Sequence, residues 1–339
     1  MRHINIPIFI PHLGCPNACV FCNQKKISGS VGYDFEDVES EIERALSTTS
    51  SEDEIELAFF GGSFTGIDRG EMLRLLALAK GHMLSGRIGG IRLSTRPDYI
   101  DPEITAILRE YGVMTVELGI QSMSDAVLRA SGRGHSAADS EKACAMLVDA
   151  GISVVGQMMI GLPASTASDE VETAERICRM GCSASRIYPT AVFAGTELEA
   201  MVHRREYIPL TLEDAVERSA AALEVFLSHG VKCIRIGLCE GKQLHDEDGI
   251  VAGISHSAVG ELAMSCVMRN RIFTALDLYE SKALIGKTLV ITVGQGMTSR
   301  TAGQKRCNKD AIRNKYHVNN IKIVENTDVL GYNIKIDVF

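Results

Sequence analysis

The sequence alternates short apolar runs with amphipathic stretches, and this alternation constrains the fold more than any other feature. Seven apolar runs have the length of β-strands and cover residues 4–10, 55–60, 91–94, 113–120, 154–160, 185–189 and 231–236. Between them, apolar residues recur every three or four positions, as in helices with one buried face. These stretches cover residues 35–46, 70–84, 103–111, 136–150, 168–179 and 212–229. Strands that alternate with helices form parallel sheets, so we expect an α/β fold.

The alternation weakens after about residue 240. We expect a strand at 287–293, a helix at 302–316 and two strands at 320–325 and 332–339. This order predicts a small C-terminal α+β unit. We therefore expect a core domain at residues 1–240 and an accessory region at residues 241–339, which the chain of 339 residues is long enough to form.

Three cysteines lie in one short loop after the first expected strand. Cys15, Cys19 and Cys22 have the spacing C-x3-C-x2-C. Thiolates are soft ligands that suit iron–sulfur clusters and zinc, and a cubane cluster held by three of them keeps one iron without a protein ligand. Catalytic metal sites keep such a position open. The other seven cysteines are scattered, which favours small buried side chains over a second metal site.

Polar and glycine-containing motifs follow the next four strands. Ligands of parallel sheets bind at the carboxyl ends of the strands, where these motifs would meet the cysteine loop. Paired glycines let backbone amides approach a ligand, and arginine can pair with a carboxylate. The candidate residues are Gly61, Gly62, Ser63 and Thr65 after the second strand, Ser94, Arg96 and Asp98 after the third, Gln121 after the fourth and Gly161 after the fifth. The alternatives are an ordinary turn at the glycines and a solvated Arg96–Asp98 pair.

A basic run at 128–136 follows the fourth strand and reads Leu-Arg-Ala-Ser-Gly-Arg-Gly-His-Ser. It has two interpretations. Its arginines contact a substrate phosphate, or the run is a basic turn before the next helix.

Together these motifs resemble those of the radical S-adenosylmethionine (SAM) superfamily. The resemblance covers residues 7–240 and includes Phe21, the aromatic residue before the last cysteine of the loop. It implies a partial (β/α)6 barrel of the TIM type, with a [4Fe–4S] cluster on the three cysteines and SAM on the open iron. It also implies that the glycine motif at 61–65 receives the amino group of SAM and that Gly161 lies along the adenine. Arg96 is then the candidate for the SAM carboxylate.

Within this superfamily the details resemble the Elongator catalytic subunit and the anaerobic coproporphyrinogen III oxidase group, and the former more closely. The motifs are Asn-Gln-Lys-Lys-Ile-Ser-Gly at 23–29, Gly-Gly-Ser-Phe-Thr at 61–65, Ser-Thr-Arg-Pro-Asp-Tyr-Ile at 94–100, Gly-Arg-Gly-His-Ser at 132–136 and Ile-Tyr-Pro-Thr at 187–190. There are two departures. The stretch after residue 240 is too short for the acetyltransferase domain of the Elongator subunit, and the sequence has no Trp for the signature of the oxidase.

The C-terminal unit offers a second kind of site. Gly303-Gln304-Lys305-Arg306 opens an expected helix and loosely resembles the glycine-rich turn of KH-type RNA-binding units, with Arg306 where that turn has its second glycine. Lys305, Arg306 and Lys309 place positive charge at the helix start, which suits phosphate. The alternative interpretation is a solvated basic turn.

The predicted function is that of a radical SAM enzyme that cleaves SAM reductively to a 5′-deoxyadenosyl radical and acts on RNA, as in tRNA modification. The expected cofactors are a [4Fe–4S] cluster and SAM. The expected partners are a one-electron reductant, such as flavodoxin or ferredoxin, and RNA. A net charge of −8 argues against a protein that coats nucleic acid through general basicity. We expect no membrane segment and a cytoplasmic location.

Two alternatives stay open. In one, the same radical chemistry acts on a small porphyrin-like molecule. In the other, the chain is a non-catalytic RNA-binding protein in which His12 completes a structural zinc site with the three cysteines.

Overall fold

The computed structural model describes residues 2–10, 19–23, 35–50, 52–238 and 249–339. The chain divides into two compact units. Unit 1 comprises Met1–Thr211 and Val225–Ser255, and unit 2 comprises Leu212–Glu224 and His256–Phe339. In the part of the chain that is described, no helix has the length and apolar character needed to cross a membrane. The functional division expected at residue 240 stays a prediction.

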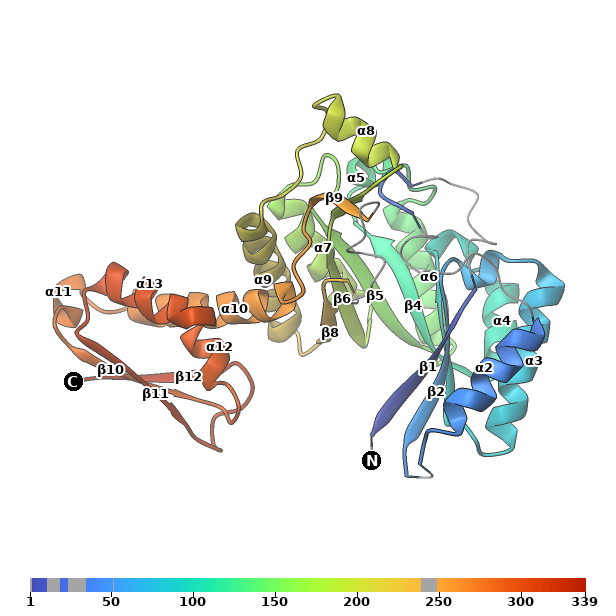
Figure 1. The fold of residues 1–339 in the computed structure, drawn as a ribbon, viewed down its shortest axis with the longest axis horizontal. Coiled ribbons are helices and arrows are strands. Elements are labelled where there is room, and N and C mark those ends of the chain that lie inside the picture. The colour runs from blue at the N-terminus through green and yellow to red at the C-terminus, as the bar shows by residue number, and fades with distance from the viewer. Residues whose placement is uncertain (1, 11–18, 24–34, 51, 239–248) are drawn as a thin grey trace. The chain divides into compact units, whose positions relative to one another are not determined.

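Unit 1 is built on one sheet of seven strands, all parallel, which curls into an open half-barrel (Figure 1). The strands follow the order β1-β2-β3-β4-β5-β6-β8. Their bounds are β1 His3–Phe9, β2 Glu54–Phe60, β3 Gly90–Thr95, β4 Val113–Gln121, β5 Ser153–Ile160, β6 Ala184–Pro189 and β8 Lys232–Ile236. All seven strands expected from the apolar runs are present, and the α/β class with a partial TIM-like barrel is confirmed.

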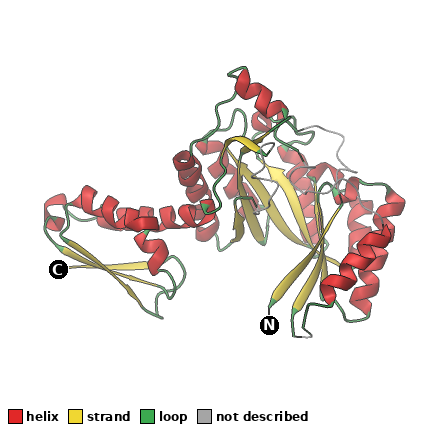
Figure 2. Ribbon diagram, viewed as in Figure 1, coloured by secondary structure: helices red, strands yellow, loops and turns green. Residues whose placement is uncertain are grey.

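Helices between the strands cover the outer face of the half-barrel (Figure 2). They are α2 Phe35–Leu46, α3 Arg69–Leu84, α4 Pro102–Glu110, α6 Ala137–Asp149 and α7 Ala167–Arg179. The starts of α3, α4, α6 and α7 have a local cause, because a side chain at each accepts a hydrogen bond from a free backbone N–H. Asp68 caps α3 and Asp101 caps α4, while Ser136 and Thr166 open capping boxes for α6 and α7.

Strand residues alternate between the two faces of the sheet. Leu57, Leu93, Leu118 and Ile187 point outward, are fully buried and form the core against the helices. The residues between them line the inner face, and several of these are charged. This alternation places the polar strand residues inside the half-barrel.

Six short elements in the described part of unit 1 were not expected from the sequence. They are helices α5 Asp125–Ala130 and α8 Glu197–His203, the 3-10 helices η1 Phe64–Gly66 and η2 Pro97–Tyr99, and strands β7 Ala191–Phe193 and β9 Ile250–Gly253. β7 and β9 pair antiparallel as a separate two-stranded sheet. Each element has seven residues or fewer, which is too short for a periodic pattern to identify.

Unit 2 packs helices on one face of a three-stranded sheet with the order β11-β10-β12. β10 is parallel to β11 and antiparallel to β12. The strands are β10 Thr288–Val293, β11 Asn320–Glu325 and β12 Ile334–Val338, and the helices are α10 Val259–Leu276, α11 Ser281–Leu284, α12 Thr298–Ala302 and α13 Cys307–Tyr316. The first part of α9, Leu212–Ser228, also belongs to this unit. The small C-terminal α+β unit is thereby confirmed.

The helix expected at 302–316 begins later, at Cys307, and a separate short helix, α12, precedes it. A turn that starts at Gly303 lies between the two helices. Gly303 has φ 76° and ψ 156°, a conformation open essentially to glycine alone. Lys305 and Arg306 then have φ 53° and 68° before α13 begins. Gly303, Lys305 and Arg306 therefore depart from the α-helical conformation, and α13 begins only at Cys307.

Candidate active site at the carboxyl edge of the half-barrel

Residues 19–23, the described part of the cysteine loop, lie at the carboxyl edge of the half-barrel. Cys19 is buried and Cys22 is half-buried, whereas Cys15 lies outside the described residues. The loop is held from two sides. Val20 N–H donates to Ser131 O at 3.1 Å, and Val20 O accepts from Leu198 N–H at 2.8 Å.

Apolar packing adds to this support. Val20 and Phe21 pack against Val192, Leu198 and Tyr207, which come from the β7–α8 region and the segment after it. The unexpected elements β7 and α8 therefore form the wall that fixes the loop of the two described cysteines.

The glycine motif follows β2 next to the end of β1. Gly61 has φ 101°, and a Cβ there would lie 3.1 Å from Ile10 O. Gly62 follows it at the same edge, and Ser63 is buried. Thr65 is also buried, and its hydroxyl donates to Tyr99 O at 2.9 Å and lies 2.6 Å from Thr95 Oγ1. Thr65 thus ties this motif to the loop after β3.

Arg96 and Asp98 form a two-pronged pair after β3. Arg96 Nε and Nη2 donate to the two carboxylate oxygens of Asp98 at 2.9 and 2.8 Å. Burial alone would raise the pKa of Asp98, but the hydrogen bonds and charge of Arg96 outweigh it and hold that pKa below its usual range. The Arg96 side chain is 3% exposed and the Asp98 side chain 24% exposed, so Arg96 is buried while Asp98 still meets solvent. Ser94 lies on β3 just before it and is half-buried.

Arg133 lies against the cysteine loop. Its Nη2 donates to Gly119 O at 2.7 Å, and its Nη1 lies 3.5 Å from Cys19 Sγ. Sequence reasoning gave the run around Arg133 two interpretations and named no single residue. No sequence signal could have found it, because the chain returns through α5, a helix of six residues, to set residue 133 beside the end of β4.

Several polar atoms at this edge are buried without a hydrogen-bond partner among the described residues. Arg133 Nε and Gln121 Oε1 are among them. Buried donors and acceptors normally have partners, so these atoms fit a site that a polar ligand completes. With the thiol of Cys19 beside them, the residues present suit a thiolate-bound metal and a ligand carrying both carboxylate and hydroxyl or amino groups.

The turn after β5 is held on both sides of Gly161. Its N–H donates to Glu170 Oε1 at 2.6 Å, and its carbonyl accepts from the Tyr207 hydroxyl at 2.6 Å. Glu170 is 2% exposed and also accepts from Ser165 Oγ at 3.0 Å. The Gly161 peptide is therefore fixed at the carboxyl edge, which is the position predicted from the sequence.

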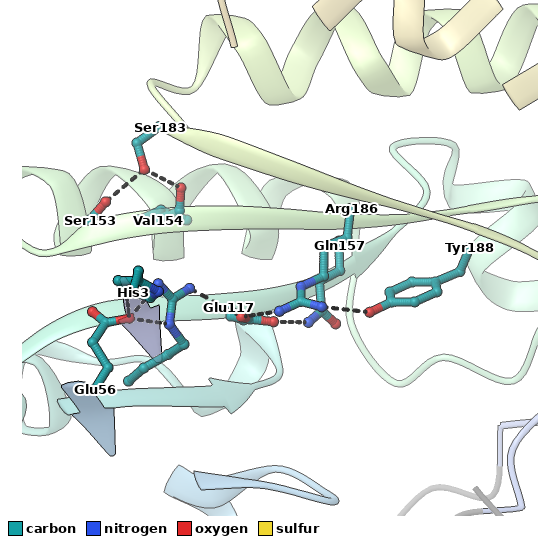
Figure 3. Close-up of polar contacts among 10 residues, drawn as sticks. His3, Glu56, Glu117, Ser153, Val154, Gln157, Ser183, Arg186 and Tyr188 are labelled. Carbon is teal, nitrogen blue, oxygen red and sulfur yellow. Dashed lines mark hydrogen bonds and ion pairs between the residues drawn. The ribbon is translucent and has the colours of Figure 1, made fainter. Parts of the chain in front are cut away.

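A chain of charged side chains runs along the inner face below this edge (Figure 3). The Glu117 carboxylate is its centre and is 1% exposed. It accepts from Arg92 Nη1 at 3.2 Å, Arg186 Nη2 at 2.7 Å and Gln157 Nε2 at 2.7 Å. Arg92 also pairs with Glu56 at 2.7 Å. Sequence reasoning did not identify this network.

His135 offers a pH-dependent test of how this site is built. Its ring is buried, and Nε2–H donates to Ile120 O at 3.1 Å. Burial, followed by the charge of Arg133, lowers its pKa from 6.5 to about 4, with Asp98 and Arg96 also near. In the unfolded chain His135 binds a proton below about pH 6.5, but in the native state it stays neutral down to about pH 4. Stability is therefore lost as pH falls through this window, by about 3 kcal/mol.

The measurement is urea unfolding between pH 4 and 7 for the wild type and His135→Gln, which keeps a donor for Ile120 O. The difference between the two curves should shrink as pH falls from 6.5 to 4. A difference that is constant over this range would contradict a neutral buried His135.

The basic residues of unit 2 lie in two settings. Lys305 and Arg306 are exposed on the turn between α12 and α13. Lys309 Nζ donates to Ile321 O at 3.0 Å and fastens α13 to β11. Asn308, 2% exposed, fixes the turn from below by donating to Ser265, Arg300 and Thr301 carbonyls.

Comparison with protein families identifies the class. Residues 9–177 match the Radical SAM superfamily, and residues 182–269 match the Radical_SAM C-terminal domain. The chain belongs to the radical SAM superfamily of enzymes.

Among curated proteins, the chain is similar to the tRNA uridine(34) acetyltransferase of Methanocaldococcus infernus, with 33% identity over 174 residues, 50% of this chain and 31% of that protein. It is 28% identical over 214 residues to Elongator complex protein 3 of Saccharomyces cerevisiae, covering 56% of this chain and 38% of that one. An uncharacterized protein of Methanocaldococcus jannaschii is 28% identical over 60% of this chain and 65% of its own length. The chain thus spans about a third of the curated acetyltransferases it matches.

Solved structures show the same fold. The archaeal Methanocaldococcus infernus Elp3 with an N-terminal deletion aligns with a TM-score of 0.62 and 22% identity over 81% of this chain and 63% of that chain. The coproporphyrinogen III oxidase of Escherichia coli aligns with a TM-score of 0.50 and 13% identity over 81% and 75%. These likenesses concern the fold alone.

Proposed function

We propose that this enzyme holds a [4Fe–4S] cluster on Cys15, Cys19 and Cys22 and uses it with SAM to generate a radical that acts on RNA. When bound, cluster and SAM supply a one-electron cleavage of the sulfonium that gives methionine and a 5′-deoxyadenosyl radical able to abstract hydrogen. The observation that carries the proposal is the place of Arg133, which lies 3.5 Å from Cys19 Sγ with its Nε buried and unsatisfied.

The residues of the carboxyl edge have separate tasks in this proposal. The backbone after β2 at Gly61, Gly62 and Ser63 offers hydrogen bonds to the amino group of SAM. Arg133 is better placed than Arg96 for the carboxylate, since Arg96 already holds Asp98 by two hydrogen bonds. Gln121 accepts from a hydroxyl group.

The remaining residues orient and enclose the site. The Gly161 peptide lies along the adenine, and Phe21 shields the loop through its contacts with the β7–α8 wall. Ser94 and the Arg96–Asp98 pair border the ribose side, and Thr65 fixes the glycine motif through Tyr99 O.

Anaerobic purification and reconstitution test the chemistry. The wild type should bind iron and sulfide in the amounts of one [4Fe–4S] cluster, and with dithionite and SAM it should release 5′-deoxyadenosine. Cys19→Ala should lose the cluster and at least 100-fold of the SAM cleavage, because the open-iron site needs all three thiolates. Colourless protein with one zinc would overturn the proposal in favour of the non-catalytic alternative.

Two observations favour RNA as the substrate class. Relatives described as tRNA uridine(34) acetyltransferases share the matched region. Unit 2 presents Lys305 and Arg306 exposed on a turn between two helices above a three-stranded sheet, an arrangement that suits contact with a nucleic-acid backbone. The electron donor and the cytoplasmic location stay predictions.

Lys305→Gln with Arg306→Gln should weaken binding of bulk tRNA by about tenfold and lower the salt dependence, because two phosphate contacts are lost. Filter binding between 0.05 and 0.2 M salt measures both. Lys282→Gln with Lys287→Gln removes the same charge from other exposed positions of unit 2 and should have a smaller effect. Equal losses in the two double variants would show that only net charge matters.

If the wild type cleaves SAM but binds no tRNA, the porphyrin-like substrate takes the place of RNA.

A further inference from the structure

One row of residues crosses the inner face of the half-barrel from β4 to β8. In the register of the sheet, Gly119 pairs with Gln157, Gln157 with Arg186, and Arg186 with Arg235. Gly119 O is the acceptor that holds Arg133 against Cys19. The row therefore begins at the candidate cofactor site and ends at the open edge strand.

A β-bulge sets the last pair of this row. The register shifts between Ser185 and Arg186, so that Arg235 rather than Ile234 lies opposite Arg186. Ile236 pairs with the buried Ile187 of the outer face, which leaves Arg235 on the inner face with Arg186. Bulges of this kind re-aim a side chain and are common beside active sites.

Two arginines thus occupy paired positions on neighbouring strands, and like charges at such positions are destabilising unless a counter-charge is present. Glu117 offsets Arg186 at 2.7 Å. The Arg235 side chain makes no ion pair or hydrogen bond within the described ranges. Arg186 Nε is buried and has no partner among the described residues, and its Nη1 lies 3.5 Å from the Tyr188 hydroxyl.

The positions of Arg186 and Arg235 in the sheet suit them to bind a group of the substrate. Neighbouring strands are about 4.8 Å apart, so β6 and β8 lie roughly 10 and 14 Å along the sheet from Gly119. That separation leaves room for a nucleoside between the cofactor site and the arginines. A guanidinium pair recognises an oxyanion, phosphate above all.

We propose that Arg186 and Arg235 bind an oxyanion of the substrate, the phosphate of the nucleotide whose nucleoside faces the cofactor site. Glu117 is a positioning residue that holds Arg186 in the row. This inference rests on the proposed function. A carboxylate of a porphyrin-like molecule has the same chemistry as the phosphate, and the experiment separates the two sources.

The test uses the full chain, reconstituted anaerobically, with Lys305→Gln and Arg306→Gln as background so that the turn of unit 2 does not contribute. Into this background Arg235→Gln, Arg235→Lys or Arg109→Gln is introduced. Arg109 is exposed on α4 and serves as the control. Affinities for bulk tRNA and for coproporphyrin are measured between 0.05 and 0.2 M salt, together with the melting temperature without ligand.

Arg235→Gln should weaken tRNA binding by about tenfold and lower the salt slope by about one, while Arg235→Lys keeps most of the affinity. Without ligand, Arg235→Gln should raise the melting temperature, because it removes the repulsion from Arg186. If Arg235 had only a structural role, its replacement would not weaken tRNA binding and raise the melting temperature at the same time. Arg109→Gln should change neither quantity.

Unchanged tRNA affinity and melting temperature in Arg235→Gln, in a background that binds tRNA, would overturn the inference and leave the proposed function intact. If Arg235→Gln lost coproporphyrin binding and kept tRNA binding, the oxyanion site would be supported. The oxyanion would then come from a porphyrin-like molecule and not from RNA. A wild type that neither cleaves SAM nor binds either probe would overturn the proposed function, and this inference with it.

Discussion

Glu117→Leu should lower the free energy of unfolding by about 3–5 kcal/mol, the cost of leaving buried charges without their partner. The carboxylate is 1% exposed and accepts hydrogen bonds from Arg92, Arg186 and Gln157. Its removal leaves the two guanidinium groups facing one another inside the half-barrel. Leucine has a similar volume, so the loss reports the charge rather than a cavity. Urea unfolding at pH 7, followed by circular dichroism, measures it.

Glu54→Leu is the matched control. Glu54 lies on β2 of the same sheet but is exposed, and an exposed substitution of this kind changes stability by about 0.5 kcal/mol or less. Glu117→Gln should fall between the two, because it keeps hydrogen-bonding atoms and loses the charge. If Glu117→Leu unfolds within 1 kcal/mol of the wild type, the network contributes no stability and Glu117 has another role.

The inner-face network shows what a single sequence does not reveal. The charged residues of this network come from four different strands. In the sequence each looks like a polar residue within a mainly apolar run: Glu56, Arg92, Glu117 and Arg186. Their contacts depend on the register between strands that are 25 to 69 residues apart in the chain. Periodicity identifies the strands and which residues share a face, but it does not fix that register.

The sequence likewise predicted only part of the candidate active site. Parallel strands bring their carboxyl ends to one edge, so the cysteine loop and the motifs near Gly61, Arg96 and Gln121 were expected together from order alone. The position of Arg133 was not, because it depends on α5, a helix of six residues without a periodic signal. The Arg96–Asp98 pair was foreseen as a pair, but the burial of Arg96 within it was not.

In the C-terminal unit, the sequence did not predict the backbone conformation of one residue, Gly303. The sequence predicts one helix that begins at Ala302 and runs through Gly303 to Tyr316. In the structure Gly303 instead has φ 76°, and a Cβ there would lie 2.6 Å from Cys307 Sγ and 2.8 Å from Asn308 N. Only the three-dimensional contacts show that this glycine is required for the turn that presents Lys305 and Arg306.

Gly61→Ala adds only one methyl group, but we expect it to lower the stability of the protein and to disturb the candidate active site. The backbone there has φ 101°, and the new Cβ would lie 3.1 Å from Ile10 O and 3.3 Å from Ile10 N. Because these are backbone atoms, they cannot rotate away as a side chain would. The strained conformation and the displacement of β1 should together lower the free energy of unfolding by about 3 kcal/mol.

The same change should lower the amount of iron bound after reconstitution, since Ile10 leads into the cysteine loop and Ile10 N–H donates to Phe60 O at 2.7 Å. Gly86→Ala separates backbone strain from this displacement. Gly86 also has a positive φ, 73°, but no atom lies within 4 Å of its Cβ position, so it should cost only about 1 kcal/mol and leave iron binding unchanged. Equal losses of stability and iron in the two variants would mean that the close approach of Gly61 to β1 has no part in shaping the loop.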